Sequence, residues 1–261
     1  MAQVSETSTV PASIYTPEGR RTLLIAIVST AIIIPSLLTP YLEPVVTLFP
    51  IVAITGVLLV RSGRPARIPT WVVFNTFSAY IIVYAAYSFG TTFQLELLAL
   101  FLLGMIVYDT LGVKGGQMQS VAGKMIQYGV PLFVMVPHNR AFSFEAFREI
   151  VSEEGLEGLH ESDHGISMLG VGDGFLPGAL AVAAGNLGTQ FAIGPVAVSL
   201  PQVTTALGAI IALGILMWAE LPRAIAALIV SVPGALLGLA VGLLLDPVAL
   251  ESLTVPQIPF F

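Results

Sequence analysis

Seven long apolar runs interrupt this chain, and they restrict the kinds of fold it can adopt. Each run approaches the length of about 20 residues that a helix needs to cross a bilayer. The runs are continuous rather than alternating, which favours helices over the strands of a membrane barrel. Only 10% of the residues are charged and 56% are hydrophobic, whereas a soluble domain carries roughly a quarter charged residues. We therefore predict an all-α polytopic membrane protein with about seven transmembrane helices, embedded in a lipid bilayer, over residues 22–41, 44–61, 69–89, 93–112, 166–187, 196–219 and 224–245.

The basic residues predict how these helices are oriented. Cytoplasmic loops of membrane proteins carry an excess of Lys and Arg. With seven spans, all ten basic residues fall at the N-terminus or in alternate connections, which places every one of them on the same side. We therefore expect a multi-pass protein of the cell membrane with its N-terminus in the cytoplasm and its C-terminus outside.

The longest connection, residues 113–165, has local order of its own. Met118, Val121, Met125 and Ile126 have near-helical spacing, which indicates an amphipathic helix. The run Leu132–Val136 is too short to span a membrane and is typical of a β-strand. A short surface helix should follow, capped by Ser143, ended by Gly155, and apolar along the face with Phe144, Phe147 and Val151.

Several kinds of site receive no support from the composition. The chain has no cysteine, so a disulfide or a thiolate metal site is impossible. The sequence has no basic patch interleaved with aromatic residues, so we expect no nucleic-acid binding. His138, His160 and His164 share the long loop with seven acidic residues and so offer possible metal ligands. Their spacing matches no metal motif, however, so we expect a solvated loop with no metal and no cofactor.

Two carboxylates lie within the predicted spans at similar depth. Asp109 is near one end of its span, and Asp173 is about two turns into the next span, which runs in the opposite direction. A buried acid costs roughly 2.5 kcal/mol or more at a helix centre. Two acids facing each other would repel as anions and hold one proton between them, which is the acid–base pair that water activation requires. The glycines beside Asp173 would allow a helix or an extended peptide to approach closely.

These residues also resemble a known pair of motifs. Tyr108-Asp109 and Gly170-Val171-Gly172-Asp173 are similar to the YD and GxGD motifs of presenilins and signal peptide peptidases. The run IVYDTLGVKGGQMQSVAGKMIQYGVPLFVMVP resembles archaeal presenilin homologues in particular. The two acids are 64 residues apart, which suits this family. The resemblance covers residues 93–245 and implies a presenilin-like fold, although family members have nine spans.

The third motif of the family, PAL, is altered. Ala226-Ala227-Leu228 stands at the expected place, at the start of the last span, with alanine in place of proline. Pro233-Gly234-Ala235-Leu236 keeps the proline but is interrupted and deeper. We prefer the first candidate for its position, and ordinary helix packing accounts for the second.

The resemblance implies an intramembrane aspartyl endopeptidase whose partners are transmembrane peptide substrates. Asp109 and Asp173 would activate water, Gly170 and Gly172 would shape the site, and the strand with Leu132, Val134 and Val136 would pair with an unwound substrate. Tyr108 would either form a hydrogen bond near the two acids or only pack against neighbouring residues or the membrane interface. We divide the chain into an N-terminal region (1–92), a region with both acids (93–187) and a C-terminal region (188–261). No feature of the sequence predicts an oligomeric state.

Two other classes of protein share some of these features. A proton-coupled transporter also uses intramembrane acids and helices broken by proline. A prepilin-type peptidase also carries GxGD, but the lysine that those enzymes have soon after the aspartate is absent here.

Overall fold

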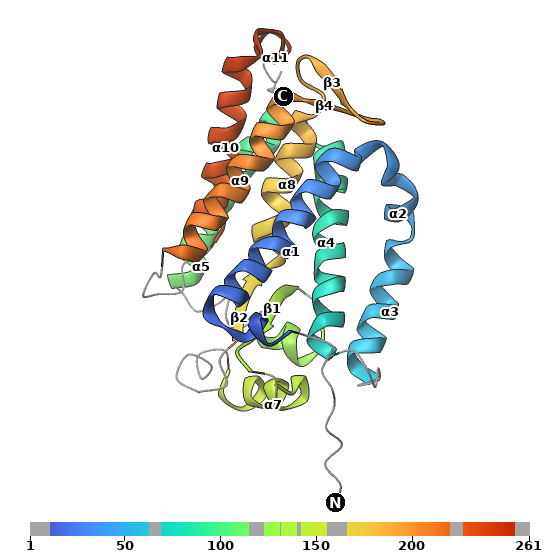
Figure 1. Ribbon diagram of the computed structural model, residues 1–261, viewed down its shortest axis with the longest axis vertical. Coiled ribbons are helices and arrows are strands. Elements are labelled where there is room, and N and C mark those ends of the chain that lie inside the picture. Colours follow the sequence, from blue (N-terminus) through green and yellow to red (C-terminus); the bar gives the residue numbers. More distant parts are fainter. Residues whose placement is uncertain are drawn as a thin grey trace, which may run out of the picture.

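The computed structural model describes residues 11–62, 69–114, 123–130, 132–139, 142–155, 166–219 and 227–253. Within these ranges the chain forms a helical bundle with a two-stranded sheet at each end (Figure 1). We refer to the end with β1, β2 and α7 as the loop end and to the opposite end, with β3, β4 and α11, as the hairpin end. In chain order the elements are η1 (Ala12–Tyr15), α1 (Pro17–Leu38), η2 (Thr39–Tyr41), α2 (Glu43–Thr47), α3 (Phe49–Ser62), α4 (Thr70–Thr92), α5 (Leu95–Lys114), β1 (Phe133–Pro137), α7 (Phe144–Glu154), β2 (Ile166–Gly170), α8 (Val171–Ala184), β3 (Gln190–Ile193), β4 (Val196–Ser199), α9 (Leu200–Trp218), α10 (Leu228–Leu245) and α11 (Pro247–Glu251).

The prediction of an all-α polytopic membrane protein is confirmed. Within the described ranges, four helical segments are long and apolar enough to cross a membrane, and α8 is a shorter apolar helix. The four are Pro17–Tyr41, Thr70–Thr92, Leu200–Trp218 and Leu228–Leu245. The count of seven spans stays a prediction.

Three of the predicted spans have different boundaries in the structure. The span predicted at 44–61 is interrupted at Leu48, between α2 and α3. The spans predicted at 166–187 and 196–219 each begin with a strand, β2 and β4, before the helix starts. Apolar strand residues next to an apolar helix cannot be separated by hydropathy alone, because both are equally suited to a buried position.

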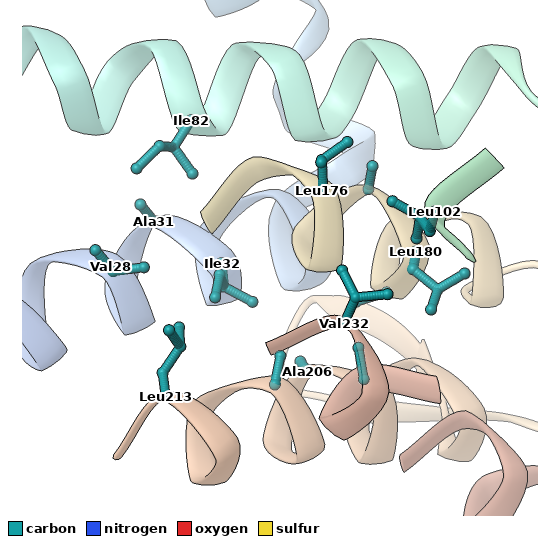
Figure 2. Packing of buried hydrophobic residues seen from close by; sticks show 14 of the residues in the cluster. Val28, Ala31, Ile32, Ile82, Leu102, Leu176, Leu180, Ala206, Leu213 and Val232 are labelled. Atoms are coloured by element: carbon teal, nitrogen blue, oxygen red, sulfur yellow. The ribbon is translucent and has the colours of Figure 1, made fainter. Parts of the chain in front are cut away.

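Helix α8 is the centre of the bundle. It contacts α1, α4, α5, α9 and α10, and Figure 2 shows labelled side chains from these helices gathered around it. Two of its glycines allow this close packing. A Cβ on Gly174 would lie 3.1 Å from side-chain carbons of Val28 and Ile82, and a Cβ on Gly178 would lie 3.1 Å from that of Ala86.

Helices α9 and α10 form a pair that depends on small residues (Figure 1). A Cβ on Gly208 would lie 2.2 Å from the carbonyl oxygen of Gly234, and a Cβ on Gly238 would lie 2.1 Å from that of Thr204. Small residues at such positions let helix backbones approach closely. Gly234 of the second PAL candidate therefore serves helix packing.

The sheet at the loop end is antiparallel and separates two hydrophobic clusters. Residues Phe133–Pro137 pair with Gly170–Ile166, so that Val134 faces Leu169. Val134, Val136 and Leu169 belong to the main cluster inside the bundle. On the other face, Met135 belongs to a second cluster and Met168 packs against it. This cluster also includes residues of α4 and α7.

Helix α7 covers this second face, and its prediction is confirmed in detail. The Ser143 side chain accepts a hydrogen bond from the helix backbone, and the helix ends at Gly155, which has a φ of 74°. The three apolar residues predicted on one face, Phe144, Phe147 and Val151, are each 2% exposed.

Some predictions fall partly or wholly on undescribed residues. Of the predicted amphipathic helix, residues 123–127 are helical, whereas Met118 and Val121 lie outside the described residues. His160, His164 and Ala226 also lie outside them.

Candidate active site

Asp173 lies in the first turn of α8 and is held there by backbone hydrogen bonds. Its Oδ2 accepts a bond of 3.1 Å from the N–H of Gly170, the residue that precedes the helix. A second bond comes from the N–H of Leu228. Leu228 is the first residue of α10, and the first N–H groups of a helix have no acceptor within that helix. The starts of α8 and α10 therefore meet at one carboxyl group.

Asp109 comes from α5, which contacts both α8 and α10. Its side chain is only 6% exposed, while that of the adjacent Tyr108 is 59% exposed. Successive residues on a helix point about 100° apart, which explains why one side chain faces the bundle and the other faces outward. Asp109 interacts electrostatically with Asp173. The two predicted acids thus lie within range of an electrostatic interaction, and Tyr108 lies on the outer surface of α5.

The two glycines of the predicted motif have different surroundings. A Cβ on Gly170 would lie 3.1 Å from Oδ2 of Asp173. A Cβ on Gly172 would meet no atom within 4 Å. Gly170 therefore allows the carboxyl group to fold back onto the backbone, whereas Gly172 borders open space beside it.

The PAL-like candidate that was preferred on position lies at the site. Ala227 and Leu228 are each 4% exposed, and Leu228 supplies the N–H described above. The rival candidate around Gly234 is more than a turn further along α10 and packs against α9. The geometry therefore favours the first candidate.

Strand β1, with Leu132 before it, differs from the expectation. Val134 and Val136 are fully buried, and β2 pairs with β1 along one edge, with Leu132 accepting a further bond from Val171. The other edge of β1 is held by side chains of Asn75 and Ser78 on α4. Both edges of β1 are already occupied, so we transfer the expected substrate pairing to β2 in the proposal below.

Sequence reasoning missed β2, Asn75 and Ser78. Ile166–Gly170 was assigned to a span because it is apolar and continuous with α8. A signal for the other two was present, since Asn75 and Ser78 are polar, lie three residues apart and interrupt the apolar run of α4. Residues three apart share one face of a helix.

His138 lies just beyond β1, where its Nε2 is 3.2 Å from Oγ of Ser167. Burial and, to a lesser degree, the charge of Arg20 lower the pKa of His138 below its usual 6.5. Within the described ranges, no group of three or more His, Asp or Glu side chains is arranged to hold a metal ion.

A comparison with known families decides the classification of this chain. The sequence model described as signal-peptide peptidase, presenilin aspartyl protease matches residues 20–248. The chain belongs to this family. The match reaches from α1 to α11, well beyond residues 93–245, where the motifs alone carried the resemblance. It supports a protease that acts within the membrane, and searches of curated proteins and of solved structures found no match.

Proposed function

We propose that the protein hydrolyses peptide bonds in transmembrane helical substrates, with Asp109 and Asp173 as the catalytic pair. The observation that carries this proposal is the electrostatic interaction between the carboxyl groups of Asp109 on α5 and Asp173 on α8, two helices that both contact α10. Asp109 and Asp173 come from two helices that run in opposite directions, and the acid at the other end of α5, Glu96, lies in its first turn. Membership of an aspartyl protease family supports this function over transport.

The chemistry follows from two carboxyl groups that share a proton. Such groups titrate as a pair, because ionising one disfavours ionising the other. The ionised group takes a proton from water, whose oxygen attacks the peptide carbonyl carbon. The protonated group gives its proton to the carbonyl oxygen. Proton transfer to the amide nitrogen then breaks the C–N bond.

The position of the pair favours access by water and by an unwound substrate. Asp173 and Leu228 are both at the first turn of their helices, so the pair lies at the loop end of the bundle. A helical substrate hides its carbonyl groups and must be extended before attack. The sheet has two strands within the described ranges, so β2 is an edge strand. Edge strands present N–H and C=O groups to which an extended peptide can bond.

The test replaces each acid by its amide. Asp109→Asn and Asp173→Asn keep the side-chain shape but remove acid–base function, so cleavage of a membrane-embedded peptide in proteoliposomes should fall by about 10²–10⁴-fold or more. Because the two acids act as a unit, the double variant should be no worse than either single variant. Glu96→Gln, which changes an acid in the first turn of α5, is the matched control and should cleave normally.

Cleavage that survives Asp173→Asn would refute the assignment. A proton-coupled transporter would instead show Asp-dependent proton flux in the same vesicles without peptide hydrolysis.

A further inference from the structure

Asn75 of α4 contacts β1 in the manner of a neighbouring strand. Its Nδ2 donates to the carbonyl oxygen of Met135 at 2.6 Å, and its Oδ1 accepts from the N–H of Met135 at 2.7 Å. Asn75 is 4% exposed. One side-chain amide thus satisfies both backbone groups of a strand residue 60 positions away in the chain.

Ser78 extends the same contact by one helical turn. Its Oγ lies 2.5 Å from the carbonyl oxygen of Phe133 and 3.1 Å from that of Phe74 in its own helix, so its one O–H has the closer acceptor on β1. The side chain is fully buried. Asn75 and Ser78 lie on one face of α4 because residues three apart on a helix are neighbours. Phe133 and Met135 lie on one edge of β1 because backbone groups alternate in direction along a strand. The two side chains therefore cover the outer edge of β1.

The opposite edge of β1 is covered by β2. Val134 pairs with Leu169 and Val136 pairs with Ser167. The backbone groups of Met168 then point away from β1, toward the edge of β2 with which no other described strand pairs. Gly170 on the same side donates its N–H to Asp173.

We propose that Asn75 and Ser78 are positioning residues that close the outer edge of β1, so that an extended substrate adds only to the free edge of β2. This inference rests on the proposed protease function and deepens it. Pairing along β2 sets the substrate register, because β2 continues directly into the turn that carries Asp173. A slip of the substrate strand by two residues preserves the facing of its side chains, so loss of register should appear as cleavage displaced by two residues.

The removal of these side chains leaves backbone groups on this edge of β1 without a hydrogen-bond partner. Without Asn75, the N–H and C=O of Met135 have no partner on α4, and β1 can move away from the helix or pair with another extended chain. The aspartates are untouched by this change. The expected defect therefore concerns binding and register, while the acid–base chemistry stays intact.

The experiment compares Asn75→Ala, Asn75→Asp and Ser78→Ala with Thr76→Ala. Thr76 is the matched control: it lies between the two on α4, is exposed, and bonds within its own helix to Val72. Purified full-length variants are reconstituted with a membrane-embedded peptide. Products are located by mass spectrometry, and KM, kcat and the pH profile of kcat are measured.

For Asn75→Ala we expect products displaced by two residues and a KM raised about five- to thirtyfold, as the loss of one to two net hydrogen bonds implies. The pH profile of kcat should not change. Asn75→Asp should be intermediate, because it keeps the acceptor for the Met135 N–H but places a second oxygen near the Met135 carbonyl. Ser78→Ala should show a smaller effect, and Thr76→Ala none.

Ser78→Ala removes a single oxygen atom, so it carries the test if Asn75→Ala does not fold. A wild-type cleavage pattern and KM in folded Asn75 and Ser78 variants would overturn the inference while leaving the protease proposal in place. The absence of Asp173-dependent cleavage in the unmutated protein would overturn the proposed function, and this inference with it.

Discussion

The substitution Gly238→Ala tests whether close contact between α9 and α10 supports the active site. The added Cβ would lie 2.1 Å from the carbonyl oxygen of Thr204 and 2.8 Å from its carbonyl carbon. Carbon–oxygen contacts in proteins normally lie at about 3.3–3.6 Å, so the helices would have to separate by about 1 Å. Backbone atoms cannot move aside as a flexible side chain can, so the helices themselves must shift.

The size of the effect follows from a matched control. Gly214 on α9 is also helical, but a Cβ there would meet no atom within 4 Å. Both alanine variants gain about 1 kcal/mol of helix propensity. Only Gly238→Ala adds the overpacking cost of about 1–3 kcal/mol. The difference between the two variants is therefore this cost alone, and we expect the upper part of the range because both clashing atoms belong to the backbone.

The assay is denaturant unfolding of both variants in one detergent, followed by peptide cleavage. Gly214→Ala should be as stable as the unmutated protein or slightly more so. Gly238→Ala should be less stable and less active, since α10 also carries the Leu228 N–H that binds Asp173. Equal stability of the two variants would show that the helices are not as close as described and would refute the reasoning.

Two further predictions concern the loop end. Gly170→Ala places a Cβ 3.1 Å from Oδ2 of Asp173 and should lower kcat. In Gly172→Ala the added Cβ meets no atom within 4 Å, so the fold should stay intact. Cleavage rates and unfolding curves of the two variants check these expectations. His138 has a lowered pKa in the folded protein, caused by burial and by Arg20, so the unfolded chain binds its proton more readily. The free energy of unfolding should therefore be unaffected by His138 above about pH 6.5, and it should fall as the pH drops below that value, because the unfolded chain then binds the proton first. His138→Gln should flatten that part of the pH–stability curve, and an unchanged slope would count against this account.

The sequence predicted the helical elements best where the signal was local. Helix α7 has its capping serine, its terminal glycine and its apolar face within 13 consecutive residues, so composition and spacing were sufficient. The predicted spans likewise rest on local hydropathy. The boundary at Gly170 was missed because Ile166–Gly170 is as apolar as the helix that follows, and only its pairing with β1 makes it a strand.

The sequence alone showed a helical membrane protein, predicted Asp109 and Asp173 as the chemically unusual residues, and favoured Ala226-Ala227-Leu228 over the second PAL-like segment. The tertiary structure decided how these residues are held. Leu228 binds Asp173 through a backbone N–H that every residue except proline possesses, so no side-chain pattern reveals it. Asn75 and Ser78 became interpretable only when α4 was placed against β1, because a polar residue in an apolar helix shows that a partner exists but not which one. Local hydropathy and capping are properties of neighbouring residues, whereas strand pairing and helix-end contacts depend on segments far apart in the chain.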